Sequence, residues 1–92
     1  MARITVERPH ALGKDKAREK AELLAEKLGE KYGIEHSWQG DIVSLEGKGA
    51  KGTVEVEDTL VRVNIDLNFF LSAMSGTIQT EVERQLDKAL VA

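Results

Sequence analysis

The stretch Val61-Arg62-Val63-Asn64-Ile65-Asp66-Leu67 decides the fold of this 92-residue chain. Its apolar residues occupy every second position, and Arg62, Asn64 and Asp66 fall between them. Because successive side chains of a strand point to opposite faces, this alternation predicts a strand with one buried face and one wet face. Such a strand needs an apolar layer to cover it, and two amphipathic helical patterns elsewhere in the chain can supply that layer.

Four further strands are predicted before this stretch, which itself predicts a strand over residues 60–67. The alternation of apolar and polar residues places them at residues 2–8, 34–39, 42–47 and 53–57. Pro9 ends the first strand because proline has no N–H for the ladder. The last four strands are joined by short turns, Gly40-Asp41, residues 48–52 and residues 57–59. Connections this short allow only an antiparallel meander.

Two helices are predicted, at residues 14–32 and 76–91. The first has its apolar stripe at Ala17, Ala21, Leu24, Ala25, Leu28 and Tyr32, and the second at Ile78, Val82, Leu86 and Ala89. Glycines 13 and 33 are the expected caps of the first helix. Charged residues are expected on the outer faces, with Asp15, Glu19, Glu22, Glu26 and Glu30 on the first helix and Glu81, Arg84, Asp87 and Lys88 on the second. Residues 68–75 fit a strand extension, a short helical turn or an ordered loop.

The predicted order is therefore β-α-β-β-β-β-α in a single domain spanning residues 1–92. This is the α+β class, with a two-layer arrangement in which both helices cover one face of an antiparallel sheet. A long final helix across a curved antiparallel sheet resembles a reduced helix-grip arrangement. That topological analogy identifies no ligand.

Composition and charge exclude several classes of function. The chain has no cysteine, so disulfides, thiolate catalysis and cysteine-ligated metals are ruled out. The net charge is −3, and residues 36–59 contain two basic against five acidic side chains, which argues against a nucleic-acid partner. The N-terminus has no continuous apolar run, and we expect no signal peptide, no transmembrane segment and a cytoplasmic protein.

The sequence shows no convincing catalytic set, cofactor motif or metal site, and we expect that the protein is not an enzyme. Its two histidines, His10 and His36, are separated by a whole predicted helix. We expect His36 to be packed or hydrogen-bonded on its strand and His10 to satisfy backbone groups at the start of the helix. A weaker alternative is hydrolase or isomerase chemistry through either histidine, which predicts a carboxylate within hydrogen-bond reach in a cleft.

Candidate contacts for a partner or ligand are His10, Trp38, Phe69, Phe70, Leu71 and Met74. The run Phe69-Phe70-Leu71 is the densest apolar cluster of the chain, and Met74 follows it closely. Because a domain this small has difficulty burying both phenylalanines, an exposed apolar patch is expected here.

Several segments in the same order resemble the polyhydroxyalkanoic acid system family. They are Ile4-Thr5-Val6-Glu7-Arg8-Pro9-His10 with Leu12-Gly13 and Ala17, Trp38-Gln39-Gly40-Asp41, Gly52-Thr53-Val54-Glu55-Val56, Leu67 with Phe70-Leu71, and residues 78–90. The resemblance covers essentially the whole chain, and His10, Trp38, Gly40 and Gly52 match family positions. It implies a small bacterial protein encoded near genes for polyhydroxyalkanoate synthesis and granule formation, with no established catalytic role.

These observations lead to two main functional hypotheses. The first is a non-enzymatic, granule-associated accessory protein that binds a polyhydroxyalkanoate granule surface or a granule protein, which predicts an exposed patch at Phe69 and Phe70. The second is a helix-grip-type domain that holds an apolar or acyl ligand between the last helix and the sheet, which predicts an enclosed apolar cavity. A homodimer is also expected, because one sheet face or edge lacks a cover.

Overall fold

The computed structural model describes residues 2–90, with every side chain in that range except that of Phe70. Five strands form one antiparallel sheet in the order β1-β5-β4-β3-β2. The strands are β1 (Ala2–Pro9), β2 (Glu35–Gln39), β3 (Ile42–Gly47), β4 (Ala50–Val56) and β5 (Leu60–Leu67). The helices are α1 (Lys14–Tyr32), α2 (Phe69–Ser72) and α3 (Ser75–Ala89).

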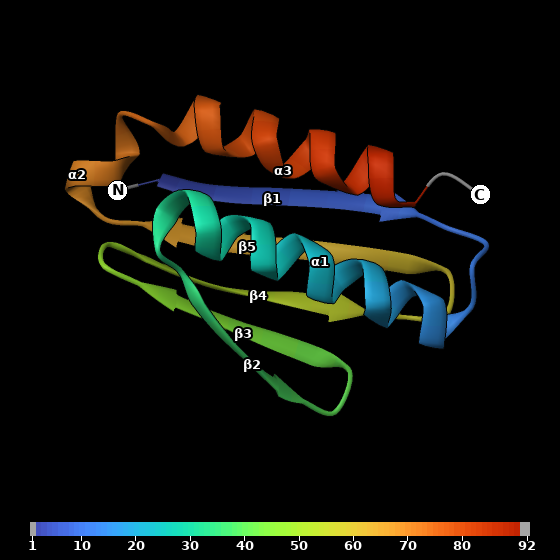
Figure 1. The fold of residues 1–92 in the computed structure, drawn as a ribbon. Coiled ribbons are helices and arrows are strands. Elements are labelled where there is room, and N and C mark those ends of the chain that lie inside the picture. The colour runs from blue at the N-terminus through green and yellow to red at the C-terminus, as the bar shows by residue number, and fades with distance from the viewer. Residues whose placement is uncertain (1, 91–92) are drawn as a thin grey trace.

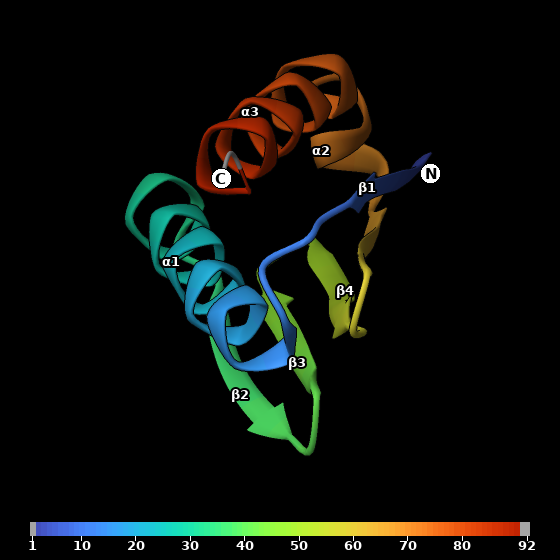
Figure 2. The ribbon, with the colours of Figure 1, turned by 90° about the vertical axis from the view of Figure 1, so that its right-hand side faces the viewer.

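Both long helices lie on the same side of the sheet (Figure 1). Helix α3 runs along β1, and α1 lies across β2, β3 and β4. Seen from the end, the molecule has two layers, and the face of the sheet opposite the helices carries no cover in the part of the chain described (Figure 2). The α+β class and the predicted element order are confirmed. The further likeness to a helix-grip arrangement stays a prediction.

The core lies between the helices and β5, as the alternation of that strand predicts. Val61, Val63, Ile65 and Leu67 are buried, while Arg62, Asn64 and Asp66 point to the open face. The helices contribute the apolar stripes that their sequence predicts, Ala17, Ala21, Leu24, Ala25 and Leu28 from α1 and Ile78, Val82 and Leu86 from α3. Gly33 caps α1 in the left-handed conformation, and its N–H donates to the carbonyl of Gly29.

Strand β4 begins at Ala50, three residues before the predicted start at residue 53. The prediction assigned Gly52 to a turn, whereas it pairs with Leu45 on one side and Ile65 on the other. A Cβ added at Gly52 would collide with the backbone oxygen of Asn64. Glycine is therefore required here by a close approach of two strands, and not by a turn.

Residues 68–75 adopt the short helical turn that was one of three predicted options. Asn68 caps α2, because its side-chain oxygen accepts a hydrogen bond from the N–H of Leu71 at 3.1 Å. Helix α3 then begins at Ser75 and ends at Ala89. Its predicted end at residue 91 lies outside the described residues.

One prediction for α3 is wrong. Glu81 was expected on the outer face, but it is buried, with 6% of its surface exposed. The Nζ atom of Lys31 on α1 lies 2.6 Å from its carboxylate, and Gln85 donates a second hydrogen bond to it. The hydrogen bonds from Lys31 and Gln85 lower the pKa of Glu81. A carboxylate can be buried here because the neighbouring helix supplies its counter-charge.

Candidate functional site

An exposed apolar patch lies where β5 passes into α2. We call this cluster the α2 patch and define it as Phe69, Leu71 and Met74. Phe69 is 81% exposed and Met74 is 41% exposed, whereas Leu71 is half-buried and packs against the core. Exposed apolar patches mark contacts with proteins or with apolar surfaces.

The α2 patch sits at one end of the molecule, beside the start of β1 (Figure 1). The backbone of α2 is held in place, because Asn68 caps it and the Ser72 hydroxyl donates to the Asn68 carbonyl at 2.8 Å. Phe69 is thus presented on an ordered turn. The side chain of Phe70, predicted as part of the same patch, lies outside what the structure describes.

A polar cluster that the sequence did not predict joins α1 to the edge strand β2. The carboxylate of Glu22 accepts hydrogen bonds from Trp38 Nε1 at 2.8 Å and from His36 Nε2 at 3.0 Å. The guanidinium of Arg18 lies over the indole ring of Trp38, 4.7 Å from its centroid. Glu22 was expected on the outer face of α1, and its contact with β2 corrects that prediction.

The hydrogen bond from Trp38, followed by the one from His36, lowers the pKa of Glu22. This cluster contains a histidine and a carboxylate within hydrogen-bond reach, as the enzymatic alternative predicted for His36. The His36 side chain is 24% exposed and that of Glu22 is 37% exposed, and the imidazole also lies 3.1 Å from the other oxygen of the carboxylate. The arrangement fixes α1 against the sheet edge and orients Trp38.

His10 is buried in the turn between β1 and α1. Its Nε2 donates to the carbonyl of Glu57 at 2.9 Å, and its Nδ1 accepts from the N–H of Leu12 at 3.2 Å. Its own N–H donates to the carbonyl of Thr59 at 2.9 Å. His10 thereby ties the β1–α1 turn to the β4–β5 turn, in line with the backbone role expected for it.

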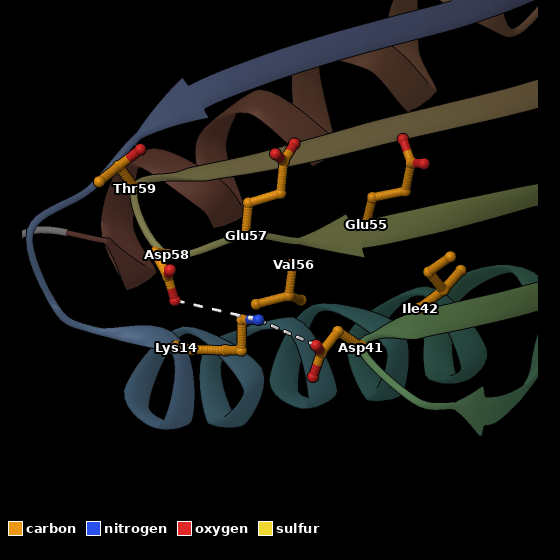
Figure 3. A pocket seen from close by; sticks show the side chains of 8 residues that line it. All are labelled: Lys14, Asp41, Ile42, Glu55, Val56, Glu57, Asp58 and Thr59. Atoms are coloured by element: carbon orange, nitrogen blue, oxygen red, sulfur yellow. Dashed lines mark ion pairs between the residues drawn. The ribbon is translucent and has the colours of Figure 1, made fainter.

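A hollow of about 500 Å³ opens beside these two turns (Figure 3). Half of its lining residues are acidic, and the lining consists of Lys14, Asp41, Ile42, Glu55, Val56, Glu57, Asp58 and Thr59. Lys14 reaches across it, with Nζ 3.0 Å from Asp41 and 3.9 Å from Asp58 (Figure 3). The hydrogen bond with Asp41 raises the pKa of Lys14. Arg62 binds Glu55 at 3.2 Å on the opposite wall.

The carboxylates of this hollow are therefore largely neutralised by the protein's own cations. Within residues 2–90 no group of three or more histidine, aspartate or glutamate side chains is placed to hold a metal ion. The hollow is a junction between turns, and it carries no catalytic constellation of the kind that acid–base chemistry requires.

The α2 patch, His10 and Trp38 are not neighbours in one site. His10 lies in the turns at the end of the sheet far from α2, and Trp38 lies on the edge strand under α1 (Figure 1). Phe69 and Leu71, in contrast, both belong to α2, and Met74 follows two residues after its end. None of the described helices is both long and apolar enough to cross a bilayer.

The sequence matches the model of a family described as "Putative polyhydroxyalkanoic acid system protein" over residues 4–90. The chain belongs to this family. The expectation drawn from its sequence segments is confirmed by this match. No curated protein matches the chain.

Among solved structures, this member of the polyhydroxyalkanoic acid system family is similar to the NMR structure of PA4090 from Pseudomonas aeruginosa. The two share 13% sequence identity, and the alignment covers 91% of this chain and 83% of the other, with a TM-score of 0.54. At that identity the likeness concerns the fold alone.

Proposed function

We propose that this chain is a non-enzymatic accessory protein of the polyhydroxyalkanoic acid system that binds the granule surface, or a protein on it, through the α2 patch. The observation that carries the proposal is the 81% exposure of Phe69 on a capped helical turn. Membership of the family supplies the system, and the patch supplies an apolar contact suited to a polyester surface. The protein would work in the cytoplasm, associated with granules.

The test is sedimentation of the purified protein with isolated granules and with granules stripped of their surface proteins. Phe69→Ser should weaken binding by about tenfold or more, because burying a phenylalanine is worth about 1.5–3 kcal/mol. Leu23→Ser is the matched control, since Leu23 is an exposed leucine on α1 with 48% of its surface accessible. It should bind like the unmodified protein.

The two kinds of granule separate the two forms of the proposal. Binding to stripped granules supports direct adsorption on the polymer, and binding to intact granules alone supports a protein partner. If the unmodified protein sediments with neither kind of granule, the proposed granule role is wrong. If Phe69→Ser and Leu23→Ser bind granules equally well, the α2 patch is not the contact.

The second candidate is a domain that binds an apolar or acyl ligand between α3 and the sheet. In this structure Ile78, Val82 and Leu86 of α3 are buried against the sheet, each with no more than 1% of its surface exposed. A ligand would have to separate these side chains from the strands. The granule proposal needs no such movement, and we favour it for that reason.

We also propose that the chain forms a homodimer. One face of the sheet is packed under two helices, and the opposite face has no cover among the described residues. A small domain commonly closes such a surface with a copy of itself. The sedimentation equilibrium of the protein over a range of concentrations tests whether it associates.

A further inference from the structure

The open face of the sheet carries its side chains in three rows that cross the five strands. Each row is defined by the strand register and is named after its residue on β1. The Arg3 row is Arg3, Asp66, Lys51, Glu46 and Glu35. The Thr5 row is Thr5, Asn64, Thr53, Ser44 and Ser37. The Glu7 row is Glu7, Arg62, Glu55, Ile42 and Gln39.

The middle row has short, neutral side chains, and each of the two outer rows carries charges of both signs. On each of three adjacent strands the sign inverts between the outer rows: Arg3 against Glu7 on β1, Asp66 against Arg62 on β5, and Lys51 against Glu55 on β4. The Arg3 row thus reads plus, minus, plus over these strands, and the Glu7 row reads minus, plus, minus.

Contacts within the chain explain only part of this pattern. Arg3 binds Asp66 at 2.7 Å and Arg62 binds Glu7 at 2.8 Å, so alternation along each row is expected. The outer rows, however, lie four residues or about 13 Å apart along the strands. That exceeds the screening length of about 8 Å at physiological salt. These contacts account for the order of signs within each row, but among the described residues no ion pair joins the Arg3 row to the Glu7 row.

We infer that the open face is the surface on which a second copy of this chain docks, with the two-fold axis along the Thr5 row. This inference rests on the proposed homodimer. The axis places the Arg3 row of one copy over the Glu7 row of the other, so that each charge on β1, β5 and β4 meets its opposite. Glu46 and Glu35 meet the uncharged Ile42 and Gln39. The neutral Thr5 row meets itself. Such an isologous contact uses one patch twice.

The charges also exclude the other simple two-fold arrangement of the two faces. An axis along β4 would place Lys51 over Lys51 and Glu55 over Glu55, and Asp66 over Glu46. Like charges face each other at all three of these positions, and Arg3 over Glu35 is the one charge pair of opposite sign, so this arrangement on balance opposes association. The axis along the Thr5 row places no two like charges over each other. Packed twisted sheets are usually rotated by about 30° relative to one another, so the facing rows cross at that angle.

The shape of the face agrees with this arrangement. A hollow of about 540 Å³ lies between the Arg3 row and the Thr5 row, where long side chains stand beside short ones. In the dimer it receives Arg62 and Glu55 of the second copy. Five strands give a face of about 24 by 20 Å, or about 1,000 Å² buried in total. Interfaces of that size are weak, and association should depend on concentration.

The decisive experiment uses two singly reversed variants, Lys51→Glu and Glu55→Lys, in sedimentation equilibrium at low salt. Each variant alone places like charges across the two-fold axis, and its dimerisation should weaken by roughly tenfold or more. An equimolar mixture should associate again as a heterodimer, because Glu at position 51 of one chain then faces Lys at position 55 of the other, and Glu55 faces Lys51. Circular dichroism shows that each variant is folded.

Three results would overturn the inference. If the unmodified protein stays monomeric at every concentration, the homodimer itself is wrong. If it associates and both variants associate equally well, the dimer exists but uses another surface. If both variants are monomeric and the mixture is as well, the predicted register is wrong. Binding to granules through the α2 patch is measured separately and can succeed or fail independently of all three.

Discussion

The two faces of the sheet are built by alternate residues of the same strands, yet they have opposite properties. On β5, Val61, Val63 and Ile65 are at most 1% exposed under the helices, whereas Arg62 and Asp66 are among the partly or fully exposed residues of the open face. The covered face holds the free energy of folding, because apolar burial is the main favourable contribution. The open face can carry a charge pattern for association, because little of the fold depends on it.

The largest expected effect tests this contrast with two adjacent residues. Ile65→Ala should lower the free energy of unfolding by about 2–5 kcal/mol, because it leaves a cavity in a packed core. Asn64→Ala, one residue away on the open face, should change it by about 0.5 kcal/mol or less. Urea denaturation of the two variants measures both values, and similar losses at the two positions would contradict the division of roles between the faces.

A second prediction concerns Gly52, where the backbone of the neighbouring strand leaves no room for a side chain. Gly52→Ala should destabilise the fold by about 1–3 kcal/mol, since the new methyl group meets the backbone of β5 and not a movable side chain. Gly76→Ala is the matched control, because a Cβ there has nothing within 4 Å. It should stabilise α3 by about 0.4–1 kcal/mol.

Thermal unfolding of these two glycine variants gives the signs directly. If Gly52→Ala were as stable as the unmodified protein, the early start of β4 at Ala50 would not depend on a close approach of strands. The turn assignment suggested by the sequence would then deserve preference.

The sequence predicted the elements whose signal is local. The alternation in β5 and the four-residue steps of α1 define their buried faces without reference to any other part of the chain. Gly52 could not be assigned in that way, because glycine favours both turns and close strand contacts. Its role depends on β5, whose backbone contacts Gly52 only once the sheet has formed.

The acidic residues Glu81 and Glu22 show the same limit for sites. Charge alone predicts exposure, and both became internal contacts because another element brings a donor. Lys31 reaches Glu81 from α1, and Trp38 reaches Glu22 from β2. The exposure of Phe69, in contrast, could be predicted from composition, since a core of this size has little room for a further aromatic ring.

The smallest expected effect concerns β2, where the face of the sheet under the helices carries polar side chains. Hydrogen bonds from Trp38 and His36 depress the pKa of Glu22 in the folded state. Its contribution to stability is therefore complete above the ordinary carboxyl pKa of about 4.3, and is lost as the pH falls through the lower folded value. Because Glu22 is partly exposed to solvent, that contribution should be at most about 1 kcal/mol.

Glu22→Gln should remove this loss, so that the unfolding free energy of the variant falls less steeply with acid than that of the unmodified protein. Glu19→Gln, at an exposed position of the same helix, should leave the acid slope as it is. The fluorescence of Trp38, the only tryptophan of the chain, follows both the unfolding and the local contact. Equal acid slopes of the unfolding free energy for the two variants would mean that Glu22 does not fix α1 to β2. The polar edge of the covered face would then contribute as little to folding as the open face.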